Sequence, residues 1–160
     1  MTDAMKIYRD NTLNPFKYFL GMLIKLPSVV FWGIKVKEID LEKCVVTTKH
    51  GWTNQNPFKS MYFSALSGSA ELSTGCLMQF YLSGRGDWSM LVTGFECEFK
   101  KKAIGLITFT CAQGHELEQK LLEIESSTSK TGKILLKAIA TNSNGEEVAS
   151  FKVDWSLKKR

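Results

Sequence analysis

The chain has 160 residues, of which 44% are hydrophobic, and this is enough for one compact domain with its own core. The net charge of +5 is small, and the two basic clusters, at residues 100–102 and 158–160, are not interleaved with aromatic residues. Composition therefore argues against nucleic-acid binding. The four cysteines, at positions 44, 76, 97 and 111, show no CxxC spacing, so we expect reduced, mostly buried thiols and no disulfide or zinc framework.

A helix is predicted near the N-terminus, over residues 14–26. Asn14 is a suitable N-cap and Pro15 a suitable first helical residue. Five apolar residues follow at helical spacing: Phe16, Phe19, Leu20, Leu23 and Ile24. The common outcome for such a face is to cover an edge of the core, and the alternative is a helix that lies on a membrane surface. The segment is too short to span a bilayer.

Two strand-like runs follow, at residues 34–39 and 44–49. Both alternate in polarity and contain Val and Thr, which is typical of an antiparallel hairpin. A loop of turn-forming and amide residues, 51–57, then leads into the next element.

Residues 61–80 are predicted to form a long buried helix. The segment is too long for an ordinary strand, and it contains one carboxylate, Glu71, and no basic residue. A helix almost without charge must be enclosed by protein. Four of its residues recur at helical spacing: Leu66, Ala70, Ser73 and Leu77.

Two long strands are predicted after this helix, at residues 89–99 and 104–112, with the lysine run 100–102 as the bend between them. Strand alternation places one set of residues of the first strand on a single face: Leu91, Thr93, Phe95, Cys97 and Phe99. Glu96 and Glu98 are expected on the opposite face.

A charged connector, residues 116–125, is expected to lead to a final hairpin of residues 134–141 and 148–157. The turn of this hairpin contains Asn144-Gly145, a pair favoured between strands of right-handed twist. The buried face of the last strand is predicted from its alternation: Ala149, Phe151, Val153, Trp155 and Leu157.

The predicted order is one helix, two strands, a long buried helix and four strands. This order excludes an alternating α/β sheet and predicts an α+β chain in which six antiparallel strands wrap one apolar helix. We expect a single domain over residues 1–160, with an N-terminal helical extension at 1–28 and the wrapped core at 30–157.

Residues 51–75 resemble a known family. Asn56, the helix start Tyr62-Phe63-Ser64-Ala65-Leu66 and the run Ala70-Glu71-Leu72-Ser73-Thr74-Gly75 are similar to the hotdog-fold thioesterase superfamily, in an uncharacterised branch near the PaaI-like acyl-CoA thioesterases. The resemblance covers roughly residues 30–157. It implies the hotdog fold, in which a curved six-stranded antiparallel sheet wraps a long central helix.

The resemblance also implies a site for thioester hydrolysis. In PaaI-like enzymes an acid on the helix, followed by a small residue and a glycine, acts as base or nucleophile, and here the match is Glu71, Ser73 and Gly75. The family helix begins with His-Gly-Gly, whose backbone amide polarises the thioester carbonyl, whereas this chain has Met61-Tyr62-Phe63 near that point. Backbone amides survive a change of side chain, so an oxyanion contact near Tyr62 or Phe63 is expected.

Each candidate residue also has a structural interpretation. Glu71 is either a base with a pKa raised by desolvation, or a glutamate that reaches a basic partner or the domain surface and has no chemical role. Asn56 either orients a water or the substrate carbonyl, or stabilises the turn beside Pro57. The run Lys100, Lys101 and Lys102 either binds the phosphates of coenzyme A or forms a solvated bend. His50 and His115 are expected at the surface, and Trp52, Trp88 and Trp155 in the core or at a subunit interface.

The first hypothesis is therefore an acyl-CoA or acyl-carrier thioesterase, with Glu71 as base aided by Asn56. Tyr62, Phe63 and Ser64 would contact the substrate, and no metal or cofactor beyond the coenzyme A of the substrate is expected. The alternative is a non-catalytic acyl-binding or interaction module, which is favoured if the side chains of residues 61–63 fill the acyl tunnel. We expect a cytoplasmic homodimer or homotetramer without stable membrane insertion, because the unpaired edge of an antiparallel sheet tends to pair.

Overall fold

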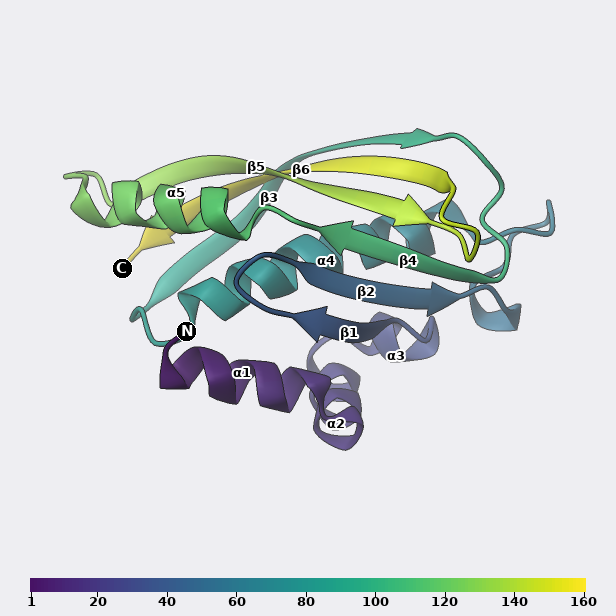
Figure 1. Cartoon of the computed structure of the whole chain (residues 1–160), viewed down its shortest axis with the longest axis horizontal. Coiled ribbons are helices and arrows are strands. Elements are labelled where there is room, and N and C mark those ends of the chain that lie inside the picture. The colour runs from purple at the N-terminus through teal and green to yellow at the C-terminus, as the bar shows by residue number, and fades with distance from the viewer.

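The computed structural model describes all 160 residues and consists of one sheet with helices packed against it (Figure 1). Three helices precede the sheet: α1 (Asp3–Leu13), α2 (Pro15–Lys25) and α3 (Pro27–Phe31). The six strands are β1 (Lys35–Ile39), β2 (Cys44–Lys49), β3 (Trp88–Phe99), β4 (Leu106–Cys111), β5 (Thr131–Thr141) and β6 (Glu147–Lys159). Between strands lie the short 3-10 helix η1 (Trp52–Asn54) and the helices α4 (Phe63–Leu82) and α5 (Gly114–Ser126).

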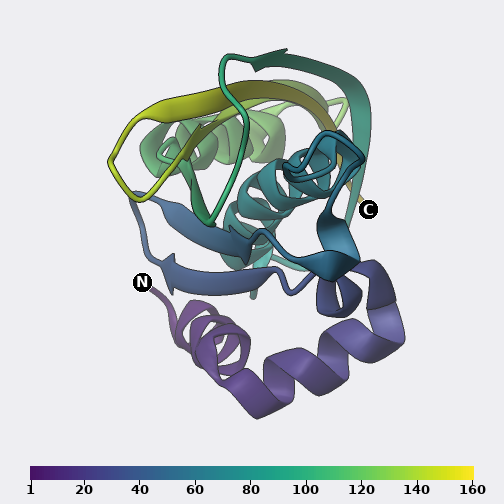
Figure 2. The same ribbon diagram turned by 90° about the vertical axis from the view of Figure 1, so that its right-hand side faces the viewer.

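The strand order is β1-β2-β4-β5-β6-β3, and every neighbouring pair is antiparallel. The sheet curves around α4, while α1, α2 and α3 form a separate layer beneath β1 and β2 (Figure 2). This confirms the expected α+β architecture, the hotdog arrangement of six antiparallel strands around one long helix. β1 and β3 are the two edges of the sheet.

Helix α4 is enclosed by protein as predicted, and its polar side chains find partners inside the core. The hydroxyls of Ser69 and Thr48 lie 2.7 Å apart, and the indole N–H of Trp155 donates to Thr74 Oγ1 at 3.1 Å. The helix begins at Phe63 rather than at residue 61, because Tyr62 is still extended (φ −66°, ψ 137°). A buried helix can carry hydroxyl groups only where each has such a partner.

The β5–β6 hairpin also matches the prediction, and both strands run longer than expected. All five residues predicted to form the inner face of β6 are buried. Gly145 in the turn has a φ of 78°, a backbone angle that residues other than glycine rarely adopt.

Strand β3 differs from the prediction because it contains a β-bulge between Val92 and Gly94. Before the bulge Met90 and Val92 pack against the core, and Leu91 is 64% exposed. A bulge adds one residue and so reverses which positions face inward. Leu91 and Thr93 therefore do not share a face with Phe95 and the inward residues after it, contrary to the expectation.

The charged segment 116–125 is a helix, α5, and not an irregular connector. Leu117, Leu121 and Ile124 are buried and recur at helical spacing beneath the charges. The helix packs closely on β5, where a Cβ on Gly132 would lie 2.6 Å from the Ile124 side chain. The many charged residues of this segment lie on the exposed face of an amphipathic helix, and its three buried apolar residues form the other face.

The N-terminal extension contains three helices instead of one, and the predicted role of the apolar face of α2 is wrong. Tyr18 and Met22 of α2 pack against the core, and the Tyr18 hydroxyl donates to Ile34 O at 3.2 Å. No residue of α2 is buried, and its predicted core-facing side chains are exposed. The buried contacts come from Met5 of α1 and Val29 of α3.

Two further expectations concern the tryptophans and the membrane. Trp155 is buried and Trp88 packs against the core, whereas Trp52 is 80% exposed. Trp52 therefore has no core position, and its expected alternative, a subunit interface, stays a prediction. Among the helices, none combines the length and apolar character needed to cross a bilayer.

Candidate functional site

A pocket of about 390 Å³ lies between α4 and the edge strand β3, and Glu71 is on its wall. Phe63, Ser67 and Glu71 share one face of α4 because they are spaced four residues apart. The pocket is lined by Phe63, Ser67, Gly68, Glu71, Phe95 and Cys97. The opposite wall thus comes from inward-facing residues of β3 that follow the bulge.

The Glu71 carboxylate has no hydrogen-bond donor and no ion-pair partner within the chain. Desolvation by the surrounding protein raises the pKa of Glu71 above its ordinary value. A side chain on Gly75, one turn further along α4, would meet Glu71 Oε1 at 3.4 Å and the Trp155 ring at 3.5 Å. Gly75 therefore leaves room for a partly desolvated carboxylate beside an indole ring.

The first turn of α4 offers free backbone donors. Tyr62 is the N-cap and makes no side-chain capping bond, and the N–H groups of Phe63 and Ser64 have no acceptor. Unpaired N–H groups at a helix start carry partial positive charge and bind developing negative charge. The Phe63 ring is half exposed and packs edge-on against Tyr62, with centroids 4.9 Å apart.

A second pocket, of about 380 Å³, shares Phe63 with the first and is lined by the whole lysine run. Lys100 Nζ lies 2.8 Å from Glu147 Oε1, and Lys101 is paired with Glu146. These carboxylates neutralise two of the three lysines. Lys102 has no carboxylate partner, and its Nζ donates to Phe58 O at 3.2 Å.

The remaining predicted residues lie outside both pockets. Asn56 Nδ2 donates to Ser60 Oγ and Met61 O, and Asn56 Oδ1 accepts from Phe58 N at 2.9 Å, so the side chain stabilises the loop. Asn54 likewise donates to Trp32 O and Lys49 O. Within one chain the structure thus brings Glu71 together with Phe63, but not with Asn56, Tyr62 or Ser64.

Sequence reasoning missed four residues of the Glu71 pocket. Ser67 and Gly68 precede Glu71 by four and three positions, so helical spacing alone could have found them. Phe95 and Cys97 could not be found in this way, because only the folded sheet places β3 beside α4.

No group of three or more His, Cys, Asp or Glu side chains in the chain could hold a metal ion. His115 is exposed as expected, whereas His50 is half-buried.

A family model described as "Domain of unknown function (DUF4442)" matches residues 17–157, which is most of the chain. The chain belongs to this family. Both pockets of this DUF4442 chain lie inside the matched range, and α1 lies outside it. A comparison with curated protein sequences gives no match.

Solved structures share the fold of this DUF4442 chain. A protein of unknown function from Pseudomonas aeruginosa, described as a probable thioesterase, is similar with a TM-score of 0.74 and 21% identity, over 91% of this chain and 97% of that one. A protein of unknown function from Chlorobaculum tepidum has a TM-score of 0.76 and 16% identity, over 93% and 99%. A thioesterase from Haemophilus influenzae has a TM-score of 0.67 and 11% identity, over 86% and 87%. The resemblance to the hotdog thioesterase group is thereby confirmed at the level of the fold.

Proposed function

We propose that this chain hydrolyses acyl thioesters, with Glu71 as the general base. One observation carries the proposal: a carboxylate with a raised pKa and no protein partner lies on the wall of a pocket. A carboxylate without a structural partner is available to accept a proton from water, and a raised pKa makes it a better base. The fold shared with proteins described as thioesterases supports the choice of substrate class.

The proposed reaction needs two groups. Glu71 removes a proton from water as the water oxygen attacks the thioester carbonyl carbon. The resulting oxyanion accepts a hydrogen bond from the free N–H of Phe63 at the start of α4. The intermediate then collapses with cleavage of the carbon–sulfur bond. The thiolate takes up the proton that Glu71 removed from water, which regenerates the carboxylate, and the products are a carboxylic acid and a free thiol.

In this proposal the two groups come from different subunits, and the spacing along α4 supports that arrangement. Phe63 and Glu71 are eight positions apart, which is about 12 Å along a helix that rises 1.5 Å per residue. One thioester carbonyl cannot meet both groups at hydrogen-bonding distance inside one chain. Two antiparallel α4 helices related by a two-fold axis near Ser67 would bring Phe63 of one subunit level with Glu71 of the other.

Strand β3 is the edge through which we propose that two subunits pair. It has 12 residues, its outer edge is unpaired, and it forms one wall of the Glu71 pocket. The other edge, β1, has five residues, a bulge and two exposed lysines, features that discourage pairing between sheet edges. The resulting assembly is a homodimer, in which Asn56 would have to assist Glu71 from the partner subunit, because it lies outside the Glu71 pocket within one chain.

The pocket beside the lysine run is the proposed position of the coenzyme A phosphates. It adjoins the Glu71 pocket through Phe63, so a substrate could lie across both. Lys102 is the lysine we expect to contact phosphate, because Lys100 and Lys101 are already paired with glutamates. No cofactor other than this part of the substrate enters the proposal.

The test is hydrolysis of a panel of acyl-CoA esters of increasing chain length, followed by release of free thiol. Glu71→Gln retains the shape of the side chain and removes its basicity, so the rate should fall by about 10² to 10⁴. Glu42→Gln, at an exposed carboxylate without an ion pair, is the matched control and should retain the wild-type rate. Retention of activity by Glu71→Gln would contradict the role of Glu71.

A second candidate is a non-catalytic acyl-binding or interaction module. It is favoured by one observation, the bulky Phe63 ring on the wall of both pockets, where the family has glycine near the start of the helix. Calorimetry with the same acyl-CoA panel distinguishes the two candidates. Binding without hydrolysis of any ester would support the module and exclude the enzyme.

A further inference from the structure

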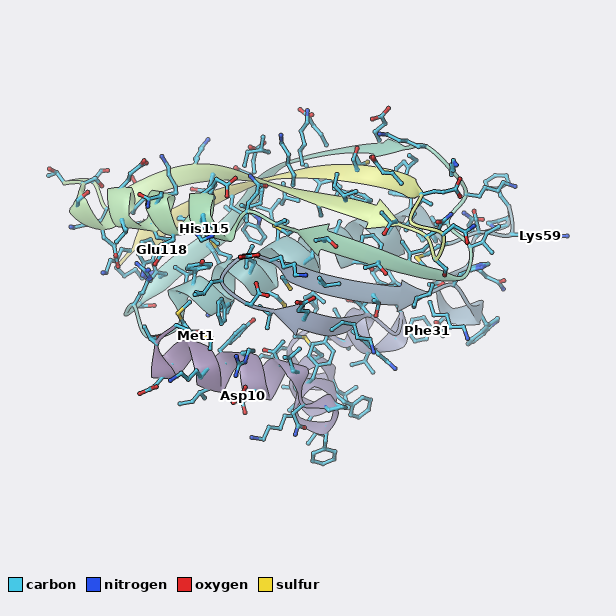
Figure 3. The ribbon with its side chains drawn as sticks, in the orientation of Figure 1. Met1, Asp10, Phe31, Lys59, His115 and Glu118 are labelled. Carbon is cyan, nitrogen blue, oxygen red and sulfur yellow. The ribbon has the colours of Figure 1, made fainter.

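Helix α2 presents an apolar face to solvent. Phe16 is 70% exposed and Ile24 is 82% exposed, and no residue of the helix is buried. The exposed apolar side chains of the helix are Phe16, Phe19, Leu20, Leu23 and Ile24. Figure 2 shows α2 on the outside of the molecule, and in Figure 3 its side chains, including aromatic rings, point away from the sheet.

The inner side of α2 is already occupied. Tyr18 and Met22, one turn apart, pack against the core, and at 100° per residue the exposed apolar side chains lie on the opposite side of the helix. A surface helix in water normally places its polar residues outward, and α2 does the reverse. The exposed apolar face therefore makes no contribution to the packing of the domain core. Phe31 of the neighbouring α3 is a further exposed apolar residue of this layer, at 58%.

The same region carries most of the net charge. The whole chain has 21 basic and 16 acidic residues, a surplus of +5, and residues 11–37 contain four lysines and no carboxylate, a surplus of +4. These lysines are Lys17, Lys25, Lys35 and Lys37, and none forms an ion pair. Lys35 and Lys37 also line a groove of about 490 Å³, together with Tyr18 and Phe19 of α2.

We infer that α2 and its neighbouring lysines bind reversibly to the surface of an anionic membrane. An outward apolar face with unpaired lysines on the same layer, at the helix and at its C-terminal end, is typical of a helix that lies in the plane of the lipid interface, where apolar side chains enter the acyl boundary and lysines meet lipid phosphates. A second copy of the chain is a poorer occupant, since a two-fold contact would oppose four unpaired lysines with four others. This surface shares no residue with the Glu71 pocket and does not depend on the proposed hydrolysis.

The test uses the full chain and vesicles of two compositions, phosphatidylcholine alone and an equimolar mixture with phosphatidylglycerol, in a sedimentation assay. We expect binding to the mixed vesicles that weakens as salt is added. Lys17→Gln with Lys25→Gln should weaken it about 25-fold, since each lysine near an anionic surface contributes about five-fold. Phe16→Ser with Ile24→Ser should weaken it at least as much, because both side chains leave the lipid.

Matched controls distinguish binding through the α2 face from a general effect of charge or of exposed apolar side chains. Lys133→Gln with Lys137→Gln removes the same charge from exposed, unpaired lysines of β5, and Leu122→Ser removes an exposed apolar side chain from α5. Both should bind mixed vesicles like wild type, and melting curves should show that all variants are folded. The inference would be overturned if the wild-type chain did not bind the mixed vesicles, or if the control variants lost as much vesicle binding as the α2 variants. It would also be overturned by self-association that Phe16→Ser with Ile24→Ser abolishes without any vesicle, because the face would then be an interface between copies.

Discussion

Glu71 is a residue whose charge opposes folding. Its pKa in the folded chain lies above the ordinary value of 4.5, so the folded state binds the proton more tightly than the unfolded state does. The stability that this proton provides is fully present below the ordinary pKa. It is lost as the pH rises through the raised pKa. A residue kept at such a position in a pocket is more consistent with chemistry than with packing.

Glu71→Gln should therefore raise the melting temperature at pH 8, where wild-type Glu71 is charged, and the gain should disappear below pH 4.5. The reason is that the neutral amide loses less hydration than a carboxylate on burial. Thermal unfolding across this pH range measures the difference, with Glu42→Gln as the exposed control. A variant less stable than wild type at pH 8 would mean that the charge has a stabilising partner.

Cys97 should be the one thiol that reacts in the native protein. It is exposed and lines the Glu71 pocket, whereas Cys44, Cys76 and Cys111 are buried, and burial raises the pKa of Cys111 to about 12. An alkylating reagent at pH 8 should label one thiol in the folded chain and all four after denaturation. Labelling should be absent in Cys97→Ser and slowed by a bound acyl-CoA. A second fast thiol would contradict the burial of the other three.

At the scale of elements, the sequence could predict α4 and the β5–β6 hairpin because each carries a strong local pattern. α4 is almost without charge, and the hairpin has a clear alternation and an Asn-Gly turn. It could not predict the bulge in β3, because the shift in register arises from pairing with β6. The spacing of Leu117 and Leu121 is helical, but the charged residues around them are equally typical of a solvated connector.

The first turn of α4 allows a direct test of the proposed site between subunits. Phe63→Pro removes the free N–H, and proline is tolerated there because Phe63 is the first helical residue and Tyr62 is extended. Phe63→Ala removes the ring and retains the N–H. We expect Phe63→Pro to lose hydrolysis by about 10² to 10³ and Phe63→Ala to retain most of it.

Mixing Phe63→Pro with Glu71→Gln extends the test to the arrangement of subunits. A mixed dimer would contain one intact site if the amide and the carboxylate come from different chains. After random exchange of subunits, the mixture should regain about a quarter of the wild-type rate. Recovery would be absent if each site were built within a single chain, and this outcome would exclude the shared arrangement.

For the whole molecule, local patterns determine which elements form but not which of them become neighbours. The Glu71 pocket exists because β3 pairs with β6, far away in the sequence, and so comes to lie beside α4. Nothing in the spacing of Phe95 and Cys97 connects them with Glu71. The family resemblance singled out Glu71 on the long helix, and Glu71 does lie on α4. Its catalytic role stays a prediction.

Pairing of two molecules through β3 should be visible in hydrogen exchange. In a monomer, the outward N–H groups of this strand face water and exchange quickly, whereas in a dimer they are hydrogen-bonded. Peptides from residues 88–99 should gain protection as the protein concentration rises, while those from β1 should not change. Sedimentation equilibrium on the same samples should give a dimer. Monomers at all concentrations, with constant exchange in β3, would remove the argument for a shared site.

Because Gly75 has no side chain, Glu71 lies close to the Trp155 ring, and the fluorescence of Trp155 should report whether Glu71 is protonated. Glu71 Oε1 and the Trp155 ring each lie within 3.5 Å of the point where a Gly75 Cβ would be, so they are no more than about 7 Å apart. A negative charge that appears so close to an indole inside protein changes the local field, and with it the emission of Trp155. The native fluorescence of the wild-type chain, compared with that of Trp155→Phe, thus becomes an optical titration of one carboxylate that needs no substrate.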